Sequence, residues 1–449
     1  MKEQYKNHIL LINPWICDFA AYDFWAKPIG LLYIGSILKK SGYNISYADC
    51  LNRFHPKAKQ NIKPDYRCGR GPYLKTKINK PKGLEDVPKN FYRYGIKKKW
   101  FIENLLSIQK PSVILVTSFM TYQYPGVTET ISLLKDIFPD TPIILGGIYA
   151  NLCYEYALIN SGADFVIKGD GIKEVFKLVK KYTEQKPVFE LDLKNFNSYP
   201  YPAFNLQSKI AYIPIITSKG CPYFCAYCAS KYLNPNFIKK DHKNVTEEIF
   251  FWRQKFKVKD FVFYDDALLI DSENHIIPML EKIIAKGYNI RFHTPNALHA
   301  KNISKKVATL MFKAGFHSIR IGLETADFEK RKAMDNKITD KDFINAVTNL
   351  KKAGFSYNQV GAYLLIGLPE QSVKEMESGI KFVKQARITP VLAYYTPIPH
   401  TKMWDMAVKT SRYDLNADPI YTNNAIFPCM DTPFSDGKIS YLKRLSASP

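Results

Sequence analysis

Three cysteines, Cys221, Cys225 and Cys228, lie close together in the stretch TSKGCPYFCAYCAS. Thiolates this close in sequence can bind one soft metal centre. A structural zinc site takes four ligands, and the other five cysteines are remote and repeat no CxxC spacing: Cys17, Cys50, Cys68, Cys153 and Cys429. A [4Fe–4S] cluster held by only three thiolates leaves one iron open. The spacing therefore favours such a cluster over a closed zinc site.

The segments around these cysteines alternate between apolar strands and helices. The predicted strands are 211–217, 260–266, 290–296, 318–324, 357–369 and 389–399. Six such units predict a partial (β/α)6 TIM-like barrel, whose active site lies at the C-terminal ends of the strands. Polar residues gather at those ends: Cys221, Asp265, Asp266, Asn296, Glu324 and Glu370. We expect them to form one shared site.

The first half of the chain also alternates strands with helices. Predicted strands lie at 7–13, 44–50, 111–120, 141–150 and 163–169, and predicted helices at 30–43, 125–138, 154–161 and 171–182. This α/β pattern predicts a doubly wound, Rossmann-like parallel sheet. The expected organisation is a first domain at 1–185 with a basic insertion at 53–100, a linker at 186–210, a barrel at 211–400 and a C-terminal extension at 401–449.

The composition narrows the functional classes. No run of 18 apolar residues predicts a membrane span, and the start of the chain lacks the features of a signal peptide. We therefore expect a cytoplasmic protein, in which disulfides are disfavoured. The net charge is +23, and residues 53–100 hold fifteen Lys or Arg against three acids, with interleaved aromatics. This insertion is compatible with contact to nucleic acid and equally with an ordinary lysine-rich surface.

The sequence CPYFCAYC resembles the CxxxCxxC signature of radical S-adenosylmethionine (SAM) enzymes, with an aromatic residue before the last cysteine. The resemblance implies that the open iron binds SAM and that an electron then releases a 5′-deoxyadenosyl radical. The SAM-binding residues that it implies are Tyr227, Asp265, Asp266, Asn296, Arg320, Glu324, Leu365, Gly367 and Glu370. Two departures stand out: Tyr363 replaces a glycine of the family, and the Asp265–Asp266 pair replaces a Gly-Gly-Glu run.

Two segments of the first half, KPIGLLYIGSILKKSGYNISYADC and PIILGGIYANLCYEYALINSGADFVIKGDGIKEVFKLV, resemble the cobalamin-binding domain of one large radical SAM class. The resemblance implies that cobalamin lies over the C-terminal strand ends. The implied contacts are Asn13, Pro14, Trp15, Thr117, Ser118, Tyr122, Gly146, Gly147 and Tyr149. The D-x-H-x-x-G run of many cobalamin proteins is absent here, and this class often dispenses with it. A domain of this shape that binds no corrinoid is the alternative.

The combined resemblance implies a class B radical SAM methyltransferase, which methylates an unactivated carbon through the 5′-deoxyadenosyl radical and methylcobalamin. Alternatives are a rearrangement or ring contraction, and a basic nucleic-acid-binding protein with a structural metal. The expected partners are an unidentified small-molecule or peptide substrate and an electron donor such as flavodoxin or ferredoxin. Nucleic acid is disfavoured, because the added RNA-binding domain of methylthiotransferases is missing. Tyr395 and His400 are candidate substrate contacts, and no catalytic residue is assigned.

Overall fold

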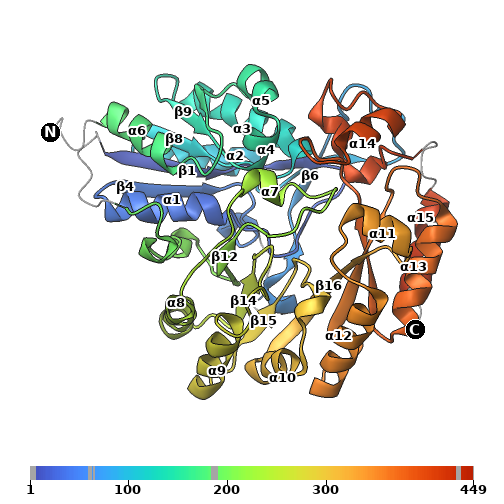
Figure 1. Ribbon diagram of the computed structural model, residues 1–449. Helices are drawn as coiled ribbons and strands as arrows, with labels where there is room; N and C mark the ends of the chain where they lie inside the picture. Colours follow the sequence, from blue (N-terminus) through green and yellow to red (C-terminus); the bar gives the residue numbers. More distant parts are fainter. Residues whose placement is uncertain (1–6, 59–62, 64–65, 184–190, 431–435, 448–449) are drawn as a thin grey trace. The chain divides into compact units, whose positions relative to one another are not determined.

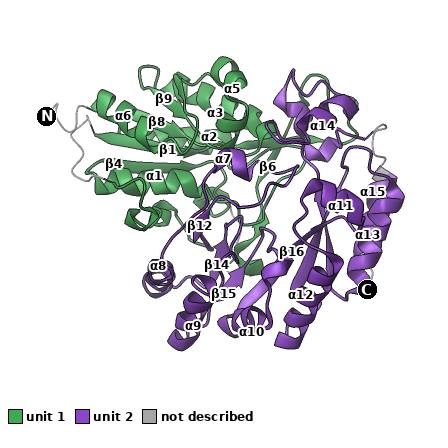
Figure 2. Ribbon diagram, viewed as in Figure 1, with its two compact units in different colours: residues 1–211 green, residues 212–449 purple. Residues whose placement is uncertain are grey.

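The chain folds into two compact units, Met1–Ala211 and Tyr212–Pro449 (Figure 2). The computed structural model describes residues 7–58, 63, 66–183, 191–430 and 436–447. Each unit is built on a parallel sheet with helices against it (Figure 1). The predicted linker at 186–210 falls in the first unit, where the N–H of Ala203 donates to the carbonyl of Leu32 at 3.0 Å. Residues 186–190 of that linker lie outside the described residues.

The sheet of the first unit has the order β10-β9-β8-β1-β4, and all of its strands are parallel. The strands are β1 (His8–Asn13), β4 (Asn44–Asp49), β8 (Val113–Val116), β9 (Ile143–Leu145) and β10 (Phe165–Val166). The chain runs from β1 to β4 at one edge, then returns to the other side of β1 with β8. Ligands of open α/β sheets bind at the C-terminal strand ends where the order reverses in this way, which here is between β1 and β8.

Helices cover both faces of this sheet because side chains alternate along the strands. The helices of the unit are α1 (Ile29–Lys40), α2 (Lys98–Leu106), α3 (Tyr124–Ile137), α4 (Ile148–Leu152), α5 (Tyr154–Asn160) and α6 (Ile172–Thr183). On β1, Leu10 and Ile12 pack in one buried cluster with α2 and α3. Ile9 and Leu11 point to the opposite face and pack with α1 and α6. Strand β1 is therefore the centre of the core.

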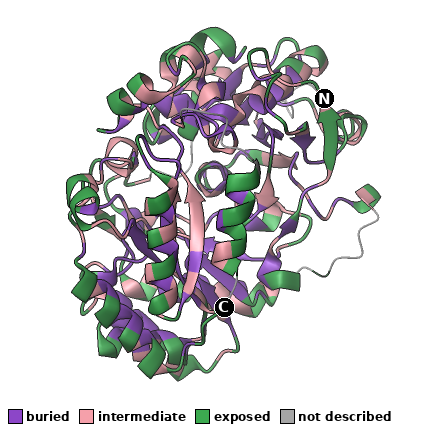
Figure 3. Cartoon of the chain, turned by 90° about the vertical axis from the view of Figure 1, so that its right-hand side faces the viewer, coloured by how far each residue is buried: buried purple, intermediate pink, exposed green. Residues whose placement is uncertain are grey.

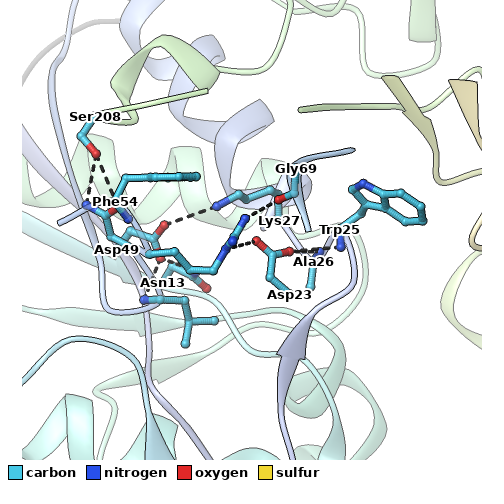
Figure 4. A network of polar contacts seen from close by, with 12 residues as sticks. Asn13, Asp23, Trp25, Ala26, Lys27, Asp49, Phe54, Gly69 and Ser208 are labelled. Carbon is cyan, nitrogen blue, oxygen red and sulfur yellow. Dashed lines mark hydrogen bonds and ion pairs between the residues drawn. The ribbon is translucent and has the colours of Figure 1, made fainter. Parts of the chain in front are cut away.

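The basic insertion pairs with strands that precede it, in two small antiparallel sheets of the first unit. Strands β2 (Ile16–Asp18), β7 (Phe91–Tyr94) and β6 (Lys75–Ile78) pair antiparallel, and β3 (Tyr22–Asp23) pairs with β5 (Gly71–Pro72). A buried ion pair ties the start of the insertion to β3, with Arg53 Nε 2.9 Å from Asp23 Oδ2 (Figure 4). The insertion is thus attached to the segment that directly follows β1.

The second unit has six parallel strands in sequence order, β11-β14-β15-β16-β17-β18. They are β11 (Ile213–Ile215), β14 (Asp260–Phe263), β15 (Arg291–His293), β16 (Phe316–Glu324), β17 (Val360–Ile366) and β18 (Thr389–Tyr394). The main helices between them are α8 (His242–Phe256), α9 (Ile276–Lys286), α10 (Lys305–Ala314), α12 (Asp340–Ala353) and α13 (Val373–Gln385). The predicted α/β class, with a doubly wound sheet and a partial barrel, is confirmed.

Local sequence signals fix where the barrel helices begin. Ser304 caps α10, and α12 and α13 start with reciprocal capping boxes, Thr339 with Asp342 and Ser372 with Glu375. Such caps satisfy N–H groups that would otherwise lack partners at the first turn. The helices present exposed residues outward, while the strands behind them are largely buried (Figure 3).

The C-terminal extension contains two helices that the sequence analysis did not anticipate, α14 (Trp404–Thr410) and α15 (Asp436–Ala447). Helix α15 packs against α13 and β18 and so belongs to the second unit. No helix in the described part of the chain is long and apolar enough to cross a membrane.

Candidate active site

The cysteine loop begins where the first barrel strand ends. Beyond β11, the two-residue strand β12 (Ser218–Lys219) pairs antiparallel with β13 (Ile238–Lys239). Gly220 then turns the chain into Cys221 with φ +78°, and a Cβ on this glycine would lie 2.5 Å from the carbonyl oxygen of Asn236. A side chain at this position would clash with the backbone, so the start of the loop requires glycine.

The three thiols have a chemistry that fits an iron–sulfur cluster. Burial raises the pKa of Cys221 and Cys225, and the nearby Lys337 ammonium opposes this rise, while Cys228 is exposed. Metal binding displaces protons from such thiols. Three thiols with no fourth protein ligand in the loop suit a cluster with one open iron better than tetrahedral zinc, which takes four ligands.

The two aspartates after β14 both contact the backbone or hydroxyl groups that flank this loop. Asp265 accepts hydrogen bonds from Thr217 and Ser218, and Asp266 accepts one from the hydroxyl of Ser230. Their predicted contact with SAM stays a prediction.

A buried charged cluster lies behind the cysteine loop. Glu324, at the end of β16, is 6% exposed and has φ +68°, a strained conformation for a residue with a side chain. Lys337 Nζ lies 3.7 Å from Glu324 Oε1, 3.2 Å from Asp335 Oδ2 and 3.0 Å from the hydroxyl of Tyr227. Burial raises the pKa of Glu324, and Lys337 opposes that rise. The structure thus joins the predicted Tyr227 and Glu324 through Lys337.

Sequence reasoning missed Lys337 and Asp335. Both lie in the connection between α11 (Phe328–Met334) and α12, away from any strand end. Gln371 was also missed, although it follows the GLPE motif directly. Its Oε1 accepts from the N–H groups of Gly367 and Leu368, and its Nε2 donates to the carbonyl of Leu365. Gln371 therefore fixes the turn after β17.

The remaining predicted SAM contacts lie at or near the ends of β15, β16 and β17. Asn296 donates to the carbonyl of Tyr264 at 2.8 Å and so links the ends of β15 and β14. Arg320 lies within β16, and its guanidinium donates to the carbonyl of Ile319. The turn beyond β17 carries Gly367 with φ +85° and the exposed Glu370 with φ +58°.

The two candidate substrate contacts differ in exposure. Tyr395 is 3% exposed and packs in a buried cluster with Ala226 of the cysteine loop and Cys429. Its hydroxyl has no hydrogen-bond partner among the described residues. His400 is exposed and stacks on Tyr232, with ring centroids 4.1 Å apart.

In the first unit, the predicted cobalamin contacts meet at the ends of β8 and β9. Ser118 Oγ donates to the carbonyl of Gly146 at 2.8 Å and accepts from the N–H of Ala150 at 3.3 Å. Gly147 has φ +98°, and a Cβ there would lie 2.4 Å from the carbonyl oxygen of Ser118. A Cβ on Gly146 would meet nothing within 4 Å. The double glycine thus provides both a tight turn and open space beside it.

The other predicted contacts in this unit are largely buried. Asn13 donates to Asp49 Oδ1 at 2.7 Å, and Asp49 lies 3.8 Å from Lys27 Nζ (Figure 4). Trp15 donates from Nε1 to the carbonyl of Ile96. The predicted residues Pro14, Thr117, Tyr122 and Tyr149 are buried as well. A cavity of about 290 Å³ at the β4 edge is lined by Lys27 and Asp49 but by none of the predicted contacts.

Two family models match the chain, one in each unit. The radical SAM superfamily matches residues 215–383, and the B12-binding domain matches residues 97–176. The first match covers the cysteine loop and strands β14 to β17. The second covers β8, β9 and the double glycine.

Known proteins resemble this chain in sequence or in fold. The chain is 25% identical to an uncharacterized methyltransferase of Pyrococcus horikoshii over 66% of this chain and 70% of that protein. It is 20% identical to the anaerobic magnesium-protoporphyrin IX monomethyl ester cyclase of Rubrivivax gelatinosus, over 68% of this chain and 60% of that one. The fold resembles that of the radical SAM methyltransferase TsrM of Kitasatospora setae, with a TM-score of 0.68, 14% identity, and coverage of 98% and 89%.

The three-thiol loop at the barrel strand ends and the superfamily match define a radical SAM enzyme. The chain thus joins a radical SAM domain to a B12-binding domain, the combination found in cobalamin-dependent, methyltransferase-like radical SAM enzymes. Its cofactors are a [4Fe–4S] cluster, SAM and cobalamin. The enzyme prediction is confirmed, and the alternative of a nucleic-acid-binding protein with a structural metal is not supported.

Proposed function

We propose that this enzyme transfers a methyl group from SAM to an unactivated carbon of a small molecule or peptide. One observation carries the proposal. The same chain has the three-thiol loop in one unit and the double glycine at a strand end in the other. When bound, the cluster and cobalamin supply a carbon radical and a transferable methyl group, respectively. A ring-forming reaction is the second candidate, because one similar protein is named a cyclase.

The residues of the second unit have separable tasks in this proposal. Cys221, Cys225 and Cys228 hold the cluster. Glu324 and the end of β17 at Gly367 bind and orient SAM. The buried position of Glu324 excludes water, so its carboxylate interacts more strongly with a cationic ligand than an exposed one would. External electrons are needed, and we propose a small protein such as flavodoxin or ferredoxin as their source and the cytoplasm as the compartment.

Anaerobic purification with reconstitution tests the proposal. We expect a protein with four irons per chain that cleaves SAM only when reduced. With SAM that carries a deuterated methyl group, the product should gain that label. A colourless protein with one zinc per chain would contradict the proposal. Cleavage of SAM with a product that gains no methyl group would favour the ring-forming alternative.

Substitution of Gly146 tests the cobalamin site. Because a Cβ there meets nothing within 4 Å, Gly146→Val should leave the unit folded but fill space beside the double glycine. We expect hydroxocobalamin affinity to fall by roughly tenfold or more, as for a steric clash of about 1.4 kcal/mol. Absorption titration measures this change. Gly30→Ala is the matched control, because a Cβ on that α1 glycine also meets nothing within 4 Å. Equal affinities in both variants would place the corrinoid elsewhere.

A further inference from the structure

Two consecutive carboxylates at the end of β14 contact opposite ends of the cysteine loop. We propose that Asp265 and Asp266 are positioning residues that fix the start and the finish of this loop and thereby the geometry of the cluster. The inference rests on the proposed function only in taking Cys221, Cys225 and Cys228 as the cluster ligands. It gives the aspartate pair a role other than direct contact with SAM.

The register of two neighbouring strands brings Asp265 to the start of the loop. Strands β11 and β14 are parallel, with Ile215 opposite Phe263, and the N–H of Tyr264 continues the ladder to the carbonyl of Ile215 at 2.9 Å. The residues that follow the two strands, Thr217 and Asp265, therefore face each other at the same edge. Both are buried, with exposures of 0% and 3%.

Asp265 uses one oxygen to hold two consecutive residues. Its Oδ1 accepts from the N–H of Thr217 at 3.0 Å and the hydroxyl of Thr217 at 2.6 Å. The same oxygen accepts from the N–H and the hydroxyl of Ser218, at 2.6 and 2.7 Å. Hydrogen bonds to an ionised acceptor are about twice as strong as neutral ones. Four donors on one buried oxygen therefore hold both backbone and side chains in place.

His275 extends this arrangement from α9. Its Nε2 lies 2.8 Å from Thr217 Oγ1. Because the single hydroxyl hydrogen of Thr217 points to Asp265, the hydroxyl oxygen must accept from His275. This requires Nε2 to carry a hydrogen. Burial lowers the pKa of His275 to about 4, so the ring is neutral with its proton on Nε2. His275 thus donates to Thr217, and Thr217 donates to Asp265.

Little chain separates this anchor from the first cysteine. Ser218 pairs with Lys239 in the β12–β13 hairpin, and the carbonyl of Thr217 accepts from the N–H of Lys240 at 2.8 Å. Gly220 follows with no space for a side chain. A displacement of Ser218 must therefore move Cys221.

Asp266 acts at the other end of the loop. Its Oδ2 accepts from the hydroxyl of Ser230, and the N–H of Ser230 lies 3.4 Å from Cys228 Sγ. Ser230 is also the first residue of helix α7 (Ser230–Leu233). Adjacent residues just beyond β14 thus hold the segments before Cys221 and after Cys228.

Variants at both ends test the inference in the cluster-loaded enzyme. Asp265→Asn and Thr217→Val weaken the contacts that hold the start of the cysteine loop. Asp266→Asn weakens the contact that holds its end. Thr217→Ser keeps the hydroxyl and serves as the conservative rescue. Glu273→Gln is the matched control, because the Glu273 side chain is 71% exposed and its ion pair is with the exposed Lys306.

Three measurements are compared: the rate of iron release to a chelator, the electron paramagnetic resonance spectrum of the reduced cluster, and hydrogen exchange of residues 217–218 in protein without metal. We expect Asp265→Asn, Thr217→Val and Asp266→Asn to release iron roughly 10- to 100-fold faster, as for other residues that orient metal ligands, and to shift the spectrum. Asp265→Asn should also speed exchange. Thr217→Ser and Glu273→Gln should match the wild type.

Two results would overturn the inference. In the first, Asp265→Asn exchanges faster at 217–218 but keeps the wild-type spectrum and iron-release rate, so the contacts do not govern the cluster. In the second, exchange does not change at all. A wild-type protein that takes up no cluster would contradict the proposed function itself, which separates the two failures.

Discussion

Cys225→Ala is expected to abolish the reductive cleavage of SAM and to lower the bound iron well below four per chain. Only three thiolates are available in the loop, so the loss of one leaves two, too few to hold a cluster and keep a defined open iron. Cys225 is the most informative of the three, because it also contacts Lys337. Iron and sulfide analysis with a SAM-cleavage assay measures the effect.

Cys153→Ala is the matched control for this substitution. Cys153 is half-buried in the first unit and lies outside the cysteine loop. The control should retain iron and SAM cleavage at wild-type levels. Loss of iron in both variants would assign a ligand role to a cysteine outside the loop, while retention in both would remove the loop from cluster binding.

Lys337→Met is expected to destabilise the second unit by about 3–5 kcal/mol, because it leaves the carboxylates of Glu324 and Asp335 buried without their cation. The free energy of unfolding in urea, monitored by hydrogen exchange of β16, measures this loss. Without the ammonium, the pKa of Glu324 rises further above its unfolded value. Protonation then relieves the buried charge, so the deficit should be largest at neutral pH and shrink as the pH falls.

Lys330→Met provides the comparison. Lys330 pairs with Glu375, but its side chain is 43% exposed. Exposed pairs contribute about 0–1 kcal/mol, so this variant should be nearly as stable as the wild type. Equal losses of stability in the two lysine variants would mean that removal of the long side chain causes the loss, and not the unpaired buried carboxylates.

The sequence predicted the fold well where hydrophobic periodicity was clean. All six barrel strands and the five strands of the first sheet were placed, although most are shorter than the apolar segments that predicted them. The small sheet at β2, β6 and β7 was missed. Its pairing joins Ile16 with Tyr94, which are far apart in the chain, and local patterns do not encode such contacts.

The candidate site was predictable only where a motif marks it. The cysteines, Glu324 and Gly367 could be predicted from the sequence because they lie in or beside strand-end motifs. Lys337 was not, because it reaches Glu324 from a helix connection. The contacts of Asp265 were also out of reach, because a carboxylate at a strand end looks the same in sequence whether it binds a ligand or its own backbone.

The strand order of the first unit has a consequence for fragment design. The segment matched by the B12-binding family, residues 97–176, contains β8, β9 and β10 but neither β1 nor β4. Yet β1 lies between β8 and β4 and supplies apolar side chains to both faces of the sheet. A fragment cut at the family boundaries would keep α2 and α3 but expose the open edge of β8 and the apolar face that α1 and α6 cover, a combination that promotes aggregation. A fragment for corrinoid-binding studies must therefore include His8.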